Sequence, residues 1–188
     1  MKHNKRIVII GSAGVGKTTL FNSLKRRLGL KPINEIARDL CIRLGYKNIY
    51  EIKDQEKFRF LVLEEQIKLE EKYKEFISDR STIDCWVHWV RWSWNKVETD
   101  RWGIYESEKY YELSRNQALK YSHIIYIPRL FKGKEDGFRW NDESYQKQLN
   151  RLFKETLFEW DLMKRVYIIN SKDVNERVRD GIKFISWS

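Results

Sequence analysis

Residues 11–19 carry the strongest chemical signal in the chain, because glycines, a lysine and a threonine stand at spacings suited to binding phosphate. They read Gly11-Ser12-Ala13-Gly14-Val15-Gly16-Lys17-Thr18-Thr19 and fit the pattern G-x-x-x-x-G-K-[ST] at every fixed position. Glycines let the backbone approach phosphate oxygens closely, and backbone amides at a helix N-terminus donate hydrogen bonds to an anion. The nine residues therefore predict a site for ATP or another purine nucleoside triphosphate.

Two groups of this loop have further expected roles. Lys17 would bring its charge to the β- and γ-phosphates, and the Thr18 hydroxyl would ligate Mg²⁺ together with waters and phosphate oxygens. A second acidic residue is needed near the metal, and Asp79 suits that role because it follows an apolar run. Arg80 would clamp the phosphate acceptor or neutralise charge in the transition state. The structural alternative is an Asp79–Arg80 ion pair in which Asp79 caps the next helix.

Glu35 is a second carboxylate with a candidate catalytic role. It closes the segment Pro-Ile-Asn-Glu and is followed by Arg38. A carboxylate there could accept a proton from an acceptor hydroxyl, or hold a sugar or a metal-bound water. The alternative is a surface glutamate in a connection, and the sequence leaves open whether Glu35 or Asp79 is the base.

The segment 129–142 predicts a lid. Its glycines permit hinge motion, and its cations could close over phosphates during transfer. We expect Arg129 and Arg139 to contribute most, because a guanidinium binds phosphate with two parallel hydrogen bonds. The alternative is an exposed basic loop. The residues concerned are Arg129, Lys132, Gly133, Lys134, Gly137 and Arg139.

Two further groups of residues are candidates for holding the nucleotide base. The loop after the last strand should return beside the phosphate loop, which places Ser171 and Asp173 near adenine; the alternative is that they cap the final helix. Aromatic residues crowd a second region, where a ring could stack on a base, although spacing by three residues more often indicates a helix packed in a core. These aromatics are Trp86, Trp89, Trp92, Trp94 and Trp102.

The elements that must position these residues alternate between strand and helix. Apolar runs predict strands at 6–10, 31–36, 75–78, 122–127 and 166–170. Helical periodicity and capping residues predict helices at 18–28, 38–44, 55–73, 83–94, 106–121, 143–160 and 174–185. This order predicts an α/β fold with a parallel, doubly wound sheet, in which ligands bind beyond the carboxyl ends of the strands.

Composition limits the remaining possibilities. The 188 residues suit one domain, 1–188, without a membrane-spanning run or a signal peptide, so we expect a cytoplasmic protein. Cys41 and Cys85 offer no disulfide framework or metal spacing and are interpreted as core thiols. The net charge of +10 could attract nucleic acid, but the charges are spread along the chain, which favours a solvated basic surface. Nothing in the sequence indicates the oligomeric state.

Four segments together resemble the small P-loop kinases and ATPases grouped around bacterial nicotinamide riboside kinase, an AAA-type ATPase or kinase domain, and more distantly deoxynucleoside and thymidylate kinases. They are residues 11–20, Glu35-Ile36-Ala37-Arg38, Asp79-Arg80-Ser81-Thr82-Ile83-Asp84 and Asp136-Gly137-Phe138-Arg139. The resemblance implies a three-layer P-loop fold with five strands in the order 2-3-1-4-5 and a lid. It also implies that Glu35 and Asp79-Arg80 face the phosphate acceptor.

The expected activity is transfer of the ATP γ-phosphoryl group to a nucleoside, nucleotide or related small molecule, with Mg²⁺. A polynucleotide 5′-kinase is an alternative that the basic charge and the aromatic cluster suggest. A nucleotide-dependent ATPase or switch acting with a partner is another.

Overall fold

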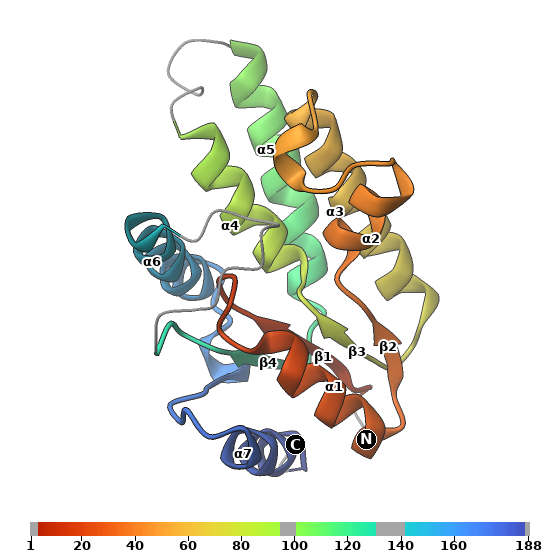
Figure 1. The fold of residues 1–188 in the computed structure, drawn as a ribbon, viewed down its shortest axis with the longest axis vertical. Coiled ribbons are helices and arrows are strands. Elements are labelled where there is room, and N and C mark those ends of the chain that lie inside the picture. The colour runs from red at the N-terminus through yellow and green to blue at the C-terminus, as the bar shows by residue number, and fades with distance from the viewer. Residues whose placement is uncertain (1–3, 95–100, 131–141, 187–188) are drawn as a thin grey trace.

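Five parallel strands form a single sheet in the residues that the computed structural model describes, which are 4–94, 101–130 and 142–186, without the side chains of 101–104. The spatial order is β2-β3-β1-β4-β5 (Figure 1). This order confirms the predicted α/β fold. The strands are β1 (Arg6–Ile10), β2 (Lys31–Ile33), β3 (Phe76–Asp79), β4 (His123–Tyr126) and β5 (Val166–Ile168).

The helices cover both faces of the sheet, as Figure 1 shows. On one face lie α1 (Lys17–Leu28) and α7 (Val174–Ser186), which contact each other. The other helices are α2 (Ile36–Arg43), α3 (Gln55–Lys72), α4 (Thr82–Ser93), α5 (Arg101–Ala118) and α6 (Glu143–Glu159), with short 3₁₀ turns at Ile49–Glu51 and Met163–Arg165. Within the described parts of the chain, no helix is long and apolar enough to cross a membrane.

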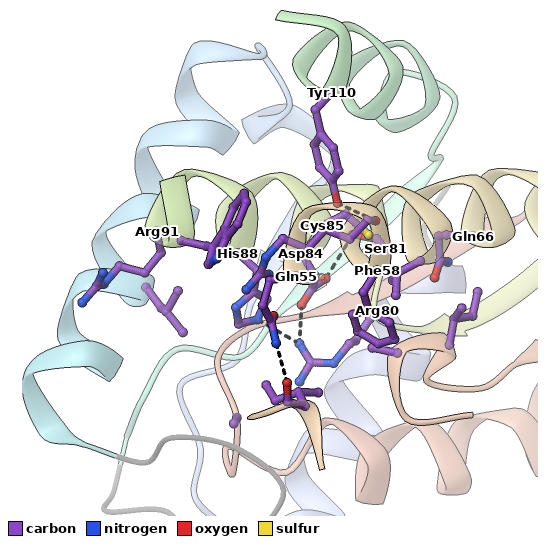
Figure 2. A pocket seen from close by; sticks show the side chains of 18 of the residues that line it. Gln55, Phe58, Gln66, Arg80, Ser81, Asp84, Cys85, His88, Arg91 and Tyr110 are labelled. Atoms are coloured by element: carbon purple, nitrogen blue, oxygen red, sulfur yellow. Dashed lines mark hydrogen bonds and ion pairs between the residues drawn. The ribbon is translucent and has the colours of Figure 1, made fainter. Parts of the chain in front are cut away.

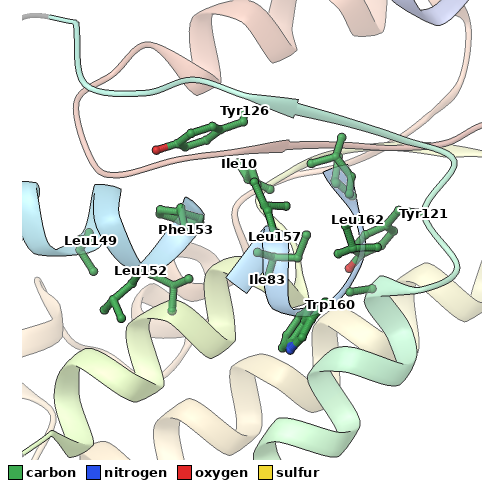
Figure 3. Packing of buried hydrophobic residues seen from close by; sticks show 14 of the residues in the cluster. Ile10, Ile83, Tyr121, Tyr126, Leu149, Leu152, Phe153, Leu157, Trp160 and Leu162 are labelled. Atoms are coloured by element: carbon green, nitrogen blue, oxygen red, sulfur yellow. The ribbon is translucent and has the colours of Figure 1, made fainter. Parts of the chain in front are cut away.

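Alternation along β1 explains why both faces must be covered. Ile7 and Ile9 point into the core beneath α1 and α7, whereas Val8 and Ile10 point into the core beneath α4 and α6. All four side chains are fully buried. Figure 3 shows the second core, where Ile10 and Ile83 pack near Leu157 and Trp160. A strand buried on both faces has to be a continuous apolar run, which is the pattern that predicted it.

The second predicted strand was too long. The segment 31–36 was expected to be extended, but β2 ends at Ile33 and Ile36 already begins α2, with Glu35 at its N-cap. β2 pairs only with β3, so it is an edge strand whose apolar residues do not need to continue. The predicted helix 106–121 is also displaced, since α5 runs from Arg101 to Ala118.

Parallel pairing brings the carboxyl ends of all five strands to one edge. Residues Arg6 to Ile9 of β1 pair with Phe76 to Asp79 of β3, so Gly11 and Arg80 follow neighbouring strand ends. The connections after β2, β4 and β5 leave from the same edge. The fold therefore collects segments from distant parts of the sequence around the loop that follows β1.

Candidate active site

The predicted phosphate loop joins β1 to α1 and has the strained geometry that only glycine accommodates. Gly11 has a φ of 140°, and a Cβ at this position would lie 2.4 Å from the carbonyl oxygen of Ile127. Gly14 and Gly16 also have positive φ values, 74° and 95°. Gly16 is the N-cap of α1, so the first amides of that helix open toward the loop.

Lys17 lies folded over this loop. Its side chain is buried, and Nζ donates a hydrogen bond to the carbonyl oxygen of Ser12 at 2.5 Å. Ser12 and Val15 are buried, whereas Gly14 and Thr18 are exposed. The lysine ammonium thus lies at the loop, as the sequence predicted, and its role toward phosphate is considered below.

Sequence analysis missed an arginine of α7 that connects the phosphate loop to the segment after β5 by hydrogen bonds. Arg177 of α7 is buried; its Nη1 donates to the Val15 carbonyl oxygen at 2.7 Å, and its Nε donates to the Ser171 carbonyl oxygen at 2.8 Å. A Cβ on Gly16 would lie 2.8 Å from the same Nη1. Burial lowers the pKa of Arg177. No motif indicated Arg177, because its partners are backbone oxygens, which have no residue-type signal, and one of them lies 162 positions away in the sequence.

Thr18 and Asp79 meet where β1 and β3 end side by side. The Thr18 Oγ1 donates to Oδ2 of Asp79 at 2.6 Å. Asp79 is buried, and its Oδ1 has no hydrogen-bond partner among the described residues. A hydroxyl beside a carboxylate with an unused oxygen is the donor set that Mg²⁺ prefers when phosphate and water complete its coordination. These two residues therefore fit the predicted metal site.

Arg80 is held by two carboxylates. Its Nε donates to Oε1 of Glu35 at 2.6 Å, and its Nη1 donates to Oδ1 of Asp84 at 3.2 Å. Glu35 also pairs with Arg38 at 3.5 Å. The backbone of Arg80 has a φ of 88°, in a region that residues other than glycine rarely adopt. Such strain persists only where the surroundings enforce it, and it concentrates at functional sites.

His88 lies one helical turn beyond Asp84 and faces the same arginine. Its Nε2 is 3.4 Å from Nη1 of Arg80. Burial and the positive charges of Arg80, Arg59 and Lys17 hold the pKa of His88 well below 6.5. The imidazole is therefore neutral at pH 7, and since Arg80 can only donate, Nε2 accepts and the proton lies on Nδ1. Burial also raises the pKa of Asp84, against the opposing charge of Arg80.

A cavity of about 360 Å³ extends from the phosphate loop between α2, α3, α4 and α6. Figure 2 shows Arg80, Asp84 and His88 converging on it from β3 and α4, with Gln55 and Phe58 of α3 opposite. Ala13 of the phosphate loop lines the same cavity. A small molecule bound there would lie against the loop, because both contribute to one continuous surface. The other lining residues are Ile36, Ala37, Ile49, Tyr50, Arg59, Val62, Gln66, Ser81, Cys85, Arg91, Trp92, Tyr110, Tyr145 and Leu149.

The remaining predicted residues lie at the edges of this region. Arg129 follows β4, and its backbone N–H donates to Oδ1 of Asn150 at 3.3 Å. Arg139 and residues 131–141 of the predicted lid fall outside the described residues. Asp173 and Ser171 make the capping contacts of the structural alternative, since Asp173 accepts from the Glu176 amide and Ser171 accepts from the Asp173 amide. The backbone of this loop is engaged as well, since the Ser171 carbonyl oxygen accepts from Nε of Arg177 and the Asp173 carbonyl oxygen accepts from the Arg177 amide.

Two of the five tryptophans, Trp86 and Trp89, belong to the core, as their spacing suggested, whereas Trp94 is exposed. Trp89 is almost fully buried and stacks on Tyr110 with ring centroids 4.3 Å apart. Trp86 packs against Trp160. Trp92 differs because it lines the cavity, while the side chain of Trp102 lies outside the description.

Cys41 is a core thiol as expected, and Cys85 packs against the core around Trp89 and Tyr110 but also lines the cavity. His88, in contrast, was missed. A single histidine with no partner at metal-ligand spacing carries no sequence signal, and only the i, i+4, i+8 periodicity of Asp84, His88 and Trp92 could have indicated a shared face.

Comparisons with known proteins agree with this architecture. A family model described as an AAA domain matches residues 6–177. A comparison with curated protein sequences found no match. Among solved structures, a NadR protein in complex with NR superposes with a TM-score of 0.75 at 20% identity, covering 98% of this chain and 51% of the NadR chain. This chain thus spans about half the length of that relative.

Two further structures match over nearly their whole length. Deoxyadenosine kinase from M. mycoides has a TM-score of 0.71 at 17% identity, covering 97% of this chain and 99% of its own. Thymidylate kinase from Candida albicans has a TM-score of 0.67 at 15% identity, covering 98% and 92%. At these identities the likeness shows a shared fold.

Proposed function

From the premise that the chain belongs to the AAA domain family, we propose that it is an ATP-dependent kinase acting on a nucleoside, nucleotide or related small molecule. The observation that carries this proposal is that Ala13 of the phosphate loop and the Arg80–Asp84 pair line one cavity of about 360 Å³. A loop that binds triphosphate beside a pocket of this size suits transfer to a small acceptor. The similar folds of several nucleoside and nucleotide kinases support the same assignment.

The nucleotide side of the site uses the loop and α1. Backbone amides of residues 11–18 and the Lys17 ammonium bind the triphosphate. Thr18 and Asp79 would hold Mg²⁺, which screens the charge of the phosphate oxygens when bound. The backbone around Ser171 and Asp173 meets the edge of adenine, and Arg177 holds that segment to the phosphate loop.

The acceptor side uses Glu35, Arg80 and the cavity. The acceptor oxygen attacks the γ-phosphorus, the bond from that phosphorus to the β–γ bridging oxygen breaks, and ADP leaves. The acceptor proton passes to a carboxylate. We assign that role to Glu35, because Asp79 is already bonded to Thr18 at the nucleotide side, whereas Glu35 lies between Arg80 and Arg38 beside the cavity. Arg80 stabilises charge on the transferred group.

The segment 129–142 remains our proposed lid over a single domain, with Arg129 and Arg139 contributing cations when it closes. The position of Arg129, which follows β4 by three residues beside the loop after β1, supports this role. Closure would exclude water from the γ-phosphate and thereby limit wasteful hydrolysis.

The test is a screen of ATP consumption with nucleosides, nucleotides, nicotinamide riboside and an oligonucleotide that carries a 5′-hydroxyl group. We expect turnover that depends on one small acceptor and is nearly abolished in Lys17→Ala. Phosphorylation of the oligonucleotide alone would favour the polynucleotide kinase instead. Slow phosphate release that no acceptor changes would reject the kinase proposal and favour an ATPase switch.

A further inference from the structure

The cavity has two ends with different charge. We call the part lined by Ala13, Arg80 and Asp84 the proximal end, and the part lined by Arg59, Arg91 and Trp92 the distal end. α4 runs from one to the other, since Trp92 follows Asp84 by eight residues, or roughly 12 Å at the rise of an α-helix. An acceptor that fills the cavity therefore meets both ends.

The proximal cation is already neutralised. Arg80 donates to Glu35 and to Asp84, at 2.6 and 3.2 Å, and all three side chains are largely buried. Two carboxylates beside one guanidinium offset its charge for a permanently anionic acceptor, while the N–H groups of Arg80 that they do not engage can still donate to oxygens of the transferred phosphoryl group. The reacting end of the acceptor thus lies beside a balanced set of charges.

The distal cations have no such balance among the residues that the structure describes. The Cζ of Arg59 lies 5.1 Å above the ring centroid of Trp92, and that of Arg91 lies 5.1 Å above the ring centroid of Tyr145. The Nε atoms of both arginines are buried without a hydrogen-bond partner in the described parts of the chain, and no ion pair joins either arginine to a carboxylate there. Figure 2 shows Arg91 reaching from α4 toward α6 at its end of the cavity.

The surroundings of Arg59 strengthen this contrast. Burial lowers its pKa, and the groups acting in the opposite direction are Tyr110, Tyr145 and Cys85, none of which is an acid ionised at pH 7. A partly buried guanidinium without a counter-charge is costly, and an incoming anion would offset that cost. A contact with the indole uses no N–H group in a conventional hydrogen bond, so the guanidinium can still form paired hydrogen bonds with a carboxylate or phosphate.

We propose that the acceptor carries a carboxylate or phosphate group at the end remote from the phosphorylated oxygen, and that Arg59 binds this group beside Trp92. The inference deepens the proposed function and rests on it, because it assigns the acceptor class of the same cavity. A neutral acceptor would leave the distal cations uncompensated, so the site discriminates against it. Arg91 of α4, which lies over Tyr145 of α6, adds a second positive charge at the distal end.

The experiment measures binding rather than turnover. Calorimetry with a non-hydrolysable ATP analogue present compares three matched pairs in which the charged group lies away from the hydroxyl to be phosphorylated: shikimate with its methyl ester, nicotinate riboside with nicotinamide riboside, and fructose 6-phosphate with fructose. The first two pairs test a carboxylate and the third tests a phosphate. Each pair is measured for the wild type, Arg59→Gln, Arg59→Lys and the control Arg151→Met, which removes an exposed arginine of α6.

We expect the charged member of at least one pair to bind about tenfold or more tightly than its neutral partner. This ratio should fall to near one in Arg59→Gln, recover in part in Arg59→Lys and remain unchanged in Arg151→Met. It should also decrease for the wild type as salt rises, which tests the charge effect even if Arg59→Gln does not fold.

Ratios near one in all three wild-type pairs, or no binding of any charged member, would overturn the inference. A ratio that survives in a folded Arg59→Gln variant, or that salt does not affect, would overturn it too. Binding that depends on Arg59 but leads to no phosphoryl transfer would support the anion site and reject the kinase.

Discussion

The Nε of Arg80 lies 2.6 Å from Oε1 of Glu35. This hydrogen bond joins the end of β3 to the start of α2, between residues 45 positions apart in the sequence. The contact fixes Glu35 beside the cavity, and the strained backbone of Arg80 shows that its position is enforced by the surrounding fold.

Glu35→Gln should lower turnover by ~10²-fold or more, because glutamine can still accept from Arg80 but has no basicity to take the acceptor proton. ATP affinity should stay nearly constant. Steady-state kinetics with saturating acceptor, beside calorimetry with an ATP analogue, measures both. Glu65→Gln is the matched control, since Glu65 pairs with Arg43 outside the cavity lining. A wild-type rate in Glu35→Gln would make Asp79 the leading base.

Asp79→Asn should fail in a different way. An amide can accept from Thr18 but cannot neutralise a metal ion, so the Mg²⁺ concentration needed for half-maximal turnover should rise, and added Mg²⁺ should restore part of the rate. Titration of Mg²⁺ in the kinetic assay tests this. Asp180→Asn changes a half-buried carboxylate of α7 that pairs with Arg179, and its Mg²⁺ requirement should match that of the wild type. An unaltered Mg²⁺ requirement in Asp79→Asn would remove Asp79 from the metal site.

Arg177→Met should weaken ATP binding by about tenfold and destabilise the fold by roughly 1–3 kcal/mol, because the carbonyl oxygens of Val15 and Ser171 lose a charged donor. Equilibrium unfolding gives the stability change, and calorimetry gives the affinity change. Arg179→Met on the same helix removes an exposed arginine and serves as control. Equal ATP affinity for the two variants would show that the hydrogen bonds from Arg177 do not determine the conformation of the phosphate loop.

Glu70 makes stability depend on pH. The carboxyl is fully buried and accepts from Gln66, Gln117 and Tyr121, and burial raises its pKa from 4.5 to about 7. The folded protein therefore holds a proton that the unfolded chain loses near pH 4.5. Its contribution to stability is fully present below pH 4.5 and is lost as pH rises through about 7, by roughly 3 kcal/mol.

The measurement is chemical unfolding at pH 5, 6, 7 and 8. The free energy of unfolding of the wild type should fall relative to that of Glu70→Gln across this range. Glu71→Gln is the control, because a hydrogen bond from Lys120 lowers the pKa of Glu71 and confines its titration to more acidic pH. Parallel curves for the wild type and Glu70→Gln would mean that Glu70 is ionised in the folded state throughout.

Much of the fold was predictable because local patterns and tertiary packing agree. β1 is an apolar run buried on both faces, and the glycine loop after it has one conformation that suits its residues. The boundary at residues 34–36 was not predictable in the same way. An apolar residue such as Ile36 suits either a buried strand or a buried helix, so the sequence does not say where the strand ends. The end of β2 depends on its pairing with β3, which stops at Ile33.

Some residues of the candidate site were likewise predictable from the sequence, and others were not. Lys17, Thr18, Asp79 and Arg80 lie within short motifs, so residue type and spacing alone marked them as candidates. Three other features depend on helices that meet across the cavity. They are the carboxylates that Arg80 contacts, the position of His88 beside the same arginine, and the position of Arg59 on Trp92 with no ion pair to a carboxylate of the described residues. Sequence records neighbours along the chain, whereas charge balance and burial depend on neighbours in space. The phosphate loop was therefore determined by the sequence itself, and the character of the acceptor pocket only by the packing of α2, α3, α4 and α6 around it.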